Sequence, residues 1–530
     1  MAIMVPVVPT FQDLSFYSDP TGNQPRYESA LRLFEKSFHE KPAFFSRSPG
    51  RVNIVGEHID YNYFSVLPMA LEVDVIIAAA TATDNKVILT NTDPKFQQEE
   101  FELPIDGSVI TINKEHHSWG NYFRCALIVA HHFIKEKYGN LIDNGKKPLK
   151  GLRLTFDGNV PTGGGLSSSA AFCVASIVTI LKANGIKSIS KDDLTHISVV
   201  SEHYVGVNTG GMDQCASIYG EPNKLLLIQF RPKLIGIPFQ IPSTNPKMVF
   251  LVTNTLFQAN KHETAPKNYN LRVVEMAIAS ELFAKKYSLN TPKDSNLKGA
   301  GTLRGVMDAY FEQILRQPAW DGNDLKIGIG RMKEMLNLAE ELFTSEEKKG
   351  FTTVQVAKRF GMSVGAFTKT FLTQIPVRFE VLKLYQRTVH VYSDAMRVLE
   401  VLQLFREHQP TDPSIAFLTE FGKILNESQV SNELYNNSSS PELKEVCAIS
   451  TAYGAYGART TGAGWGGSAV HLCTVDKLPE IVAALTEQYY KKHFPRITQK
   501  ELDSAIVVSK PGIGTCVVEY NENIISGRKM

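Results

Sequence analysis

The feature that most constrains this chain is a glycine- and serine-rich stretch at residues 161–171, Pro-Thr-Gly-Gly-Gly-Leu-Ser-Ser-Ser-Ala-Ala. A predicted strand (152–157) precedes it and an apolar helical run (170–181) follows. Glycines let a backbone approach a ligand closely, and the free N–H groups at a helix start favour an anion. We therefore predict a site for nucleotide phosphates. A serine-capped helix after a glycine turn is the simpler alternative. The missing Gly-Lys-Ser/Thr ending excludes a Walker A motif.

The bulk properties indicate a soluble protein with more than one domain. A chain of 530 residues predicts two or three domains or lobes. A formal net charge of +2 gives no general attraction to nucleic acid or to acidic membranes. No apolar run is long enough for a membrane helix, and the N-terminus has no basic segment typical of a signal peptide. The six cysteines are scattered, which predicts reduced thiols and a cytoplasmic location.

Apolar patterns predict a mixed α/β first half and a more helical second half. Strands are expected at residues 73–80, 87–92, 152–157, 225–230 and 248–253, and helices at 121–135 and 170–181. From Phe379 to Leu399, apolar residues recur every three or four positions, which predicts one long helix with a core-facing stripe. Strand character returns at residues 468–475 and 505–508.

A polar segment near the N-terminus could bind a small molecule. Residues 50–61 read Gly-Arg-Val-Asn-Ile-Val-Gly-Glu-His-Ile-Asp-Tyr, and we call them the signature segment. Its carboxylates and histidine suit sugar hydroxyls, and its arginine could steady a phosphoryl oxygen or a carboxylate. A solvated loop with a surface ion pair is the alternative. A metal site is disfavoured because the spacing lacks the helical His-Glu-x-x-His geometry.

Two further glycine-containing segments could take part in the same site. Asp213 follows a glycine pair, so it is a candidate base or charge partner, although it could simply cap a helix. Glu202 is a candidate Mg²⁺ ligand. Residues 462–467 formally contain Gly-x-Gly-x-x-Gly. We expect a helix before this loop and a strand after it, which inverts the dinucleotide-binding order and excludes that interpretation.

Two other patterns are weaker signals. Residues 356–367 look like a helix-turn-helix, but the near-zero net charge favours a structural helical hairpin over DNA binding. The pairs His116-His117 and His131-His132 lack metal-ligand spacing and are expected to be surface or packing residues.

The signature segment, the glycine–serine loop (residues 163–169) and residues 462–467 occur in an order that resembles the GHMP small-molecule kinases. The signature segment itself is similar to that of the galactokinases, especially the large fungal ones. The resemblance implies an α/β (α+β) fold with two lobes, the first similar to ribosomal protein S5 domain 2. The implied lobes are residues 1–245 and 246–530, with a helical insertion at about 302–404.

The resemblance also implies roles for individual residues. Arg51 and Asp213 match the family's catalytic pair. Ser169 and Glu202 match its Mg²⁺ positions, and Trp119 falls near its adenine pocket. The matches to sugar-contacting positions are Arg51, Glu57, His58, Asp60, Gly211, Asp213 and Tyr269. The matches to the phosphate-binding loop are Gly163, Gly164, Gly165, Leu166, Ser167, Ser168 and Ser169. Ser468-Ala469 departs from the Cys-Thr of many relatives, which should affect packing more than chemistry.

The activity implied by the resemblance is transfer of phosphate from MgATP to the C1 hydroxyl of galactose, the first step of galactose catabolism by the Leloir pathway. ATP and Mg²⁺ would be required, and the protein would be a monomer. Two alternatives stay open. One is an N-acetylgalactosamine kinase. The other is a galactose- and ATP-dependent sensor that contacts a transcriptional repressor, with or without kinase activity. The complete run Ser167-Ser168-Ser169-Ala170-Ala171 favours an active enzyme, because non-catalytic relatives lack a Ser-Ala pair there.

Overall fold

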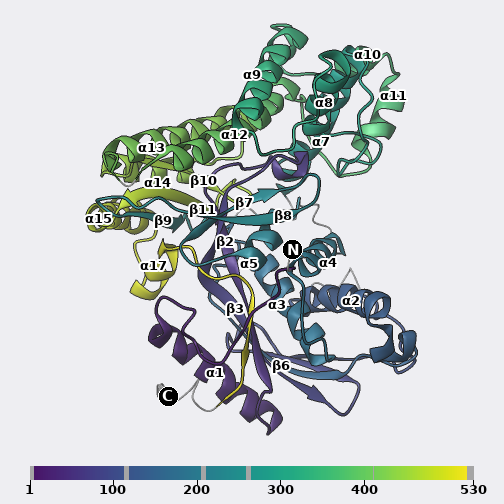
Figure 1. Cartoon of the computed structure of the whole chain (residues 1–530), viewed down its shortest axis with the longest axis vertical. Helices are drawn as coiled ribbons and strands as arrows, with labels where there is room; N and C mark the ends of the chain where they lie inside the picture. Colours follow the sequence, from purple (N-terminus) through teal and green to yellow (C-terminus); the bar gives the residue numbers. More distant parts are fainter. Residues whose placement is uncertain (1–4, 113–117, 205–209, 258–263, 410, 522–530) are drawn as a thin grey trace.

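A computed structural model of the whole chain describes residues 5–112, 118–204, 210–257, 264–409 and 411–521, with the backbone alone at residues 202–204. The chain forms a strand-rich part and a helix-rich part, which Figure 1 places at the bottom and the top of the view. The mixed α/β class predicted from the sequence is confirmed. No helix in the described ranges is long and apolar enough to cross a membrane.

The larger sheet has seven strands in the order β1-β13-β2-β3-β6-β4-β5. Neighbouring strands run antiparallel, except that β1 is parallel to β13 and β4 is parallel to β6. The bounds are β1 Thr10–Phe11, β2 Phe44–Asn53, β3 Pro68–Ala82, β4 Lys86–Asn91, β5 Glu99–Glu102, β6 Gly151–Gly158 and β13 Cys516–Glu519. Strand β13 comes later in the sequence than every strand of the second sheet, yet it lies in the larger sheet, whose other strands come from the first part of the sequence.

Helices cover the larger sheet. Helix α1 (Pro20–Phe38) packs on β3, β4 and β6, whereas α3 (Ser168–Ala183) packs on β2 and β3. Helices α2 (Gly120–Lys137), α4 (Lys191–Tyr204) and α5 (Met212–Tyr219) in turn pack against α3. Helix α3 is buried along almost its whole length, because its sequence is apolar on every face.

The second sheet has four antiparallel strands in the order β10-β11-β9-β12. The bounds are β9 Met248–Asn254, β10 Gly457–Thr461, β11 Ser468–Thr474 and β12 Ile506–Ser509, with a separate hairpin of β7 Lys224–Gln229 and β8 Ile235–Gln240. The helix expected before residues 462–467 is present as α14 (Pro441–Ala452), but strand β10, which was not predicted, lies between that helix and the loop. Residues 462–467, here called the glycine hairpin loop, join β10 to β11, so the dinucleotide-binding order is still absent.

The remaining helices lie around this sheet or in the helix-rich part at the top of Figure 1. They are α7 Tyr269–Lys286, α8 Leu303–Ala309, α9 Leu325–Leu342, α10 Thr353–Phe360, α11 Val364–Phe367, α12 Leu384–Glu407, α13 Ser414–Ser431, α15 Leu478–Leu485, α16 Lys491–His493 and α17 Gln499–Ala505. Residues 302–404 are thus largely helical, and the helical hairpin expected at 356–367 is present as α10 and α11. The lobe boundary near residue 246 stays a prediction.

The long helix predicted to begin near Phe379 begins instead at Leu384. The backbone N–H and C=O groups of Leu382 pair with those of Phe351, which holds this stretch extended. The core-facing stripe is also broader than predicted, because α12 packs against α7, α9 and α13. As a result, His390 and Asp394 are fully buried, while Val389 is only half-buried.

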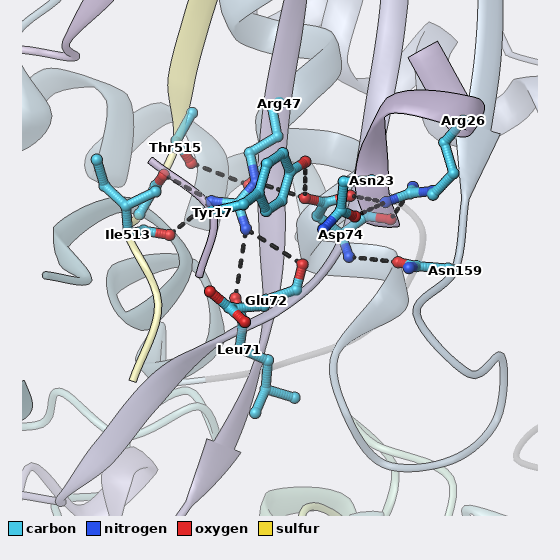
Figure 2. Close-up of polar contacts among 12 residues, drawn as sticks. Tyr17, Asn23, Arg26, Arg47, Leu71, Glu72, Asp74, Asn159, Ile513 and Thr515 are labelled. Carbon is cyan, nitrogen blue, oxygen red and sulfur yellow. Dashed lines mark hydrogen bonds and ion pairs between the residues drawn. The ribbon is translucent and has the colours of Figure 1, made fainter. Parts of the chain in front are cut away.

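A buried charge cluster connects helix α1 and the segment before β13 to the larger sheet (Figure 2). The Asp74 carboxylate on β3 accepts hydrogen bonds from Arg26 at 2.7 Å and from Arg47 at 2.5 Å. Arg47 also donates to the carbonyl oxygen of Ile513 at 2.6 Å. Because two arginines share one fully buried carboxylate, the segment before β13 and helix α1 are fixed to the same point of the sheet.

Candidate active site

A salt bridge joins β2 to the start of α5. The Arg51 Nε donates a hydrogen bond of 2.8 Å to Oδ1 of Asp213. A register shift in the β2–β3 pairing between Pro49 and Arg51 changes the direction of the strand just before this arginine. The Asp213 side chain remains 20% exposed, whereas that of Arg51 is 4% exposed. A fixed carboxylate is therefore accessible beside a buried positive charge.

The glycine–serine loop closes over the same salt bridge. Ser167 donates a hydrogen bond of 2.6 Å to Oδ2 of Asp213, and Arg51 donates one of 2.6 Å to the carbonyl oxygen of Gly165. Gly165 has a φ of +73°, a backbone conformation that L side chains rarely adopt. The predicted strand before the loop and helix after it are confirmed as β6 and α3. The N-terminal end of α3, a position suited to an anion, thus lies beside the Arg51–Asp213 pair, because its N-cap Ser167 contacts Asp213.

The glycine hairpin loop packs against the glycine–serine loop. Ser468 donates a hydrogen bond to the carbonyl oxygen of Gly164. Gly462 lies against Gly165 so closely that no side chain fits between their backbones. Ser468, where the sequence departs from many relatives, thus contacts the backbone of the glycine–serine loop.

The signature segment turns its polar side chains toward both loops. Glu57 accepts a hydrogen bond of 2.8 Å from the N–H of Gly462, and His58 Nε2 lies 2.9 Å from the carbonyl oxygen of Ala463. Since a carbonyl oxygen only accepts, this nitrogen of His58 carries the proton. Burial lowers the pKa of His58 to about 3, so its ring is neutral at physiological pH.

Asp60 places a second carboxylate near Asp213. Its Oδ2 accepts a hydrogen bond of 3.2 Å from the N–H of Gly210, the residue before Gly211. Gly211 has a φ of +97° and is the N-cap of α5. Burial, followed by the negative charge of Asp213, raises the pKa of Asp60 to about 7. The two acidic groups therefore differ in environment, one buried and one accessible.

Tyr269, at the first position of α7, lies beside the signature segment. Its ring lies 5.3 Å from that of His58 and 5.8 Å from that of Tyr61, measured between centroids. Aromatic rings and carboxylates in one region are suited to a ligand with one apolar face and several hydroxyl groups.

Comparisons with known proteins agree with this geometry. The family model described as "Galactokinase galactose-binding signature" matches residues 32–81, "GHMP kinases N terminal domain" matches 121–221, and "GHMP kinases C terminal" matches 415–491. A galactokinase of Schizosaccharomyces pombe is 66% identical over 516 residues, which cover 97% of this chain and 99% of the relative. The chain belongs to the galactokinase family.

Two further galactokinases are also similar over nearly the full length. That of Candida albicans is 51% identical, covering 96% of this chain and 98% of its own, and that of Saccharomyces cerevisiae is 43% identical, covering 93% and 94%. The crystal structure of Lactococcus lactis galactokinase complexed with galactose has a TM-score of 0.64 at 22% identity, covering 92% of this chain and 99% of that one. This likeness establishes the two-lobed GHMP kinase fold.

Trp119 is the residue that the galactokinase resemblance assigns to an adenine pocket. It borders an open hollow of about 860 Å³, which it lines together with Phe96, Gln97 and Arg124. Its ring packs edge-on against Phe172 of α3, with the centroids 6.1 Å apart. The hollow is thus close to the helix that begins at the glycine–serine loop, and its volume is within the range of small-molecule sites.

The two positions that match the galactokinase Mg²⁺ ligands differ in how far they are described. Ser169 lies in the first turn of α3, directly after the glycine–serine loop. Glu202 lies in the last turn of α4, but its side chain is outside the described residues. Within those residues, no group of three or more His, Cys, Asp or Glu side chains could hold a metal ion. Nucleotide-bound Mg²⁺ needs no such cluster, since one or two protein oxygens suffice.

Three residues that contact Glu57 from outside the signature segment were not predicted from the sequence. Arg459 on β10 is fully buried, with Nη1 3.6 Å from Oε1 of Glu57. His390 and Asp394 on α12 both hydrogen bond to the Glu57 backbone. His390 and Asp394 could have been noticed in the sequence, because they are polar residues four positions apart within a helix that was predicted to face the core.

Proposed function

We propose that this protein is a galactokinase that transfers the γ-phosphoryl group of MgATP to the C1 hydroxyl of galactose. The observation that carries the proposal is the accessible carboxylate of Asp213, held by Arg51 and Ser167 beside the glycine–serine loop. Phosphoryl transfer depends mainly on positioning and on neutralising charge, and this arrangement offers both.

In the proposed reaction, the galactose C1 oxygen attacks the γ-phosphorus and the bond to the ADP oxygen breaks. Asp213 accepts or orients the C1 hydroxyl proton, and Arg51 balances its charge. Glu57, His58, Asp60, Gly211 and Tyr269 form the sugar site. The aromatic and acidic groups described above support this assignment, since they can bind one face and several hydroxyls of a hexose.

The nucleotide is proposed to bind with its phosphates on residues 163–169 and its adenine near Trp119. The N–H groups at the start of α3 and the positive-φ glycines fit an anion. Ser169 and Glu202 would hold Mg²⁺, which supplies positive charge to the phosphate oxygens when bound.

The remaining predictions concern the location of the enzyme in the cell, its oligomeric state and its protein partners. We propose a cytoplasmic location, supported by six buried cysteines that form no disulfide bond within the described residues. A monomer and contact with a transcriptional repressor are implied only by the resemblance. Gel filtration, and co-precipitation with and without galactose and ATP, would test them.

Release of ADP by the purified protein with MgATP tests the proposed function. Galactose, N-acetylgalactosamine and glucose are offered separately, with Asp213→Asn as the control. Galactose-dependent release that is lost in the variant supports the proposal. Release chiefly with N-acetylgalactosamine would replace the substrate. Absence of release, with galactose and ATP still bound, would replace the enzyme by a ligand-dependent sensor.

A further inference from the structure

Helix α12 holds the peptide groups on both sides of Glu57. The N–H of Glu57 donates a hydrogen bond of 3.1 Å to Oδ2 of Asp394, and its carbonyl oxygen lies 2.9 Å from Nε2 of His390. The two helix residues are four positions apart and so share one face of α12. Both are fully buried, which leaves no water to replace either bond.

The hydrogen bonds of His390 determine its tautomer. The carbonyl oxygen of Glu57 can only accept, so Nε2 of His390 carries the proton. Burial lowers the pKa of His390 to about 4, so the ring is neutral and Nδ1 accepts. The partner of Nδ1 is the hydroxyl group of Ser431, 2.9 Å away on α13. Ser431 therefore fixes the ring in the form that donates to Glu57.

The hydrogen bonds of Asp394 lead back to the Glu57 side chain. Its Oδ1 accepts a hydrogen bond of 2.6 Å from Ser428, whose oxygen accepts one of 3.1 Å from Nε of Arg459. Arg459 in turn lies 3.6 Å from Oε1 of Glu57. The backbone and the carboxylate of Glu57 are thus fixed by one closed network of buried groups.

The residue after the held peptide has an unfavourable backbone conformation. His58 has a φ of +58°, in the left-handed region that non-glycine residues rarely adopt. Such a conformation persists only where the surroundings over-determine it. The contacts from α12 to Glu57 provide that constraint immediately before His58.

We propose that His390 and Asp394 are positioning residues for the sugar site, which hold the backbone of Glu57 and His58 in the sugar-binding conformation. The inference rests on the proposed function, because Glu57 and His58 are taken as sugar contacts. Neither α12 residue touches the substrate. The helical segment between residues 302 and 404 thereby contributes to sugar affinity without contacting the sugar.

The test compares His390→Leu with His390→Gln, whose amide can still donate to the Glu57 carbonyl oxygen. We expect His390→Leu to raise the KM for galactose about tenfold or more, as loss of one buried hydrogen bond implies. The KM for MgATP should change less than about twofold, and His390→Gln should recover most of the galactose affinity. Tyr392→Phe is the matched control, because this fully buried hydroxyl of α12 donates to Leu303 and not to the signature segment.

A milder variant keeps the inference testable if His390→Leu does not fold. Ser431→Ala removes the hydroxyl that fixes the tautomer, and we expect a threefold to tenfold rise in the galactose KM, about one weakened hydrogen bond. Equal rises in both KM values, or a galactose KM in Ser431→Ala no different from that of Tyr392→Phe, would overturn the inference. Absence of galactose-dependent turnover in the unmodified protein would instead overturn the proposed function, so the two failures are distinguishable.

Discussion

A Cβ atom on Gly462 would lie 2.3 Å from the carbonyl oxygen of Gly165, so the two glycine loops are in direct backbone contact. Gly462 also has a φ of +81°. We expect Gly462→Ala to displace the glycine–serine loop and to raise the KM for MgATP about tenfold or more, since small misplacements in such sites are costly. Gly330→Ala on α9 is the control, because its Cβ would meet no atom within 4 Å. Unchanged nucleotide affinity in Gly462→Ala would show that the contact is dispensable.

Asp213 is partly exposed and accepts hydrogen bonds from Arg51 and Ser167. Its replacement should lower the turnover rate without preventing the protein from folding. We expect Asp213→Asn to lower kcat by about 10²–10⁴, the usual contribution of a positioned proton acceptor. Ser167→Ala removes only the bond to Oδ2 and should lower kcat about fivefold to tenfold. Steady-state ADP release and thermal unfolding measure the two effects. Near-normal turnover in Asp213→Asn would remove this residue from the mechanism.

Asp60 should weaken the folded state at alkaline pH. Its pKa in the folded protein, about 7, lies above the usual value of 3.8, so its contribution to stability declines as pH rises from about 4 to 7. Asparagine mimics the protonated acid. We therefore expect Asp60→Asn to raise Tm at pH 8 by about 2–4 °C, to change it little at pH 5, and to raise the KM for galactose. The idea fails if the Tm difference is the same at both pH values.

Buried histidines should make the protein sensitive to mild acid. Burial lowers the pKa of His471 to about 3, and its ring nitrogens hydrogen bond with the hydroxyl groups of Thr253 and Ser450. Because the unfolded chain takes up a proton below pH 6.5, this histidine costs stability as pH falls from 6.5 toward 3, by up to about 1.4 kcal/mol per pH unit. Urea unfolding at pH 7, 6 and 5 should therefore give a shallower pH dependence for His471→Gln than for the unmodified protein. Parallel curves would refute this account.

Asp74 should be among the most sensitive positions for stability (Figure 2). Burial alone would raise its pKa, but Arg26 and Arg47 hold it below its usual value, so its contribution is lost only as pH falls below about 4. At neutral pH, Asp74→Asn leaves Arg47 buried without a carboxylate and should cost about 3–5 kcal/mol of unfolding free energy. Asp157→Asn is the control, because Asp157 pairs with the partly exposed Arg26 rather than with the fully buried Arg47, and is itself partly exposed. Equal losses in both variants would argue against a special role for the shared carboxylate.

Much of the fold and the main segments of the site followed from local patterns. The strand, loop and helix around residues 163–169 are encoded by glycines and by an apolar run, which act over a few residues. Strand β10 was missed because its five residues are all buried and show no alternation. The start of α12 was misplaced because the bridge between Phe351 and Leu382 overrides the helical period.

The sequence by itself determined the family, the mixed α/β class and the loops that form the candidate site, because glycine conformations and apolar periods are local properties of the chain. Only the tertiary structure decided which residues meet. Arg51, Ser167 and Asp213 converge from three separate elements, and His390 reaches Glu57 across more than 300 residues of sequence. Such contacts depend on how whole helices and sheets pack, and no spacing along one segment encodes that packing.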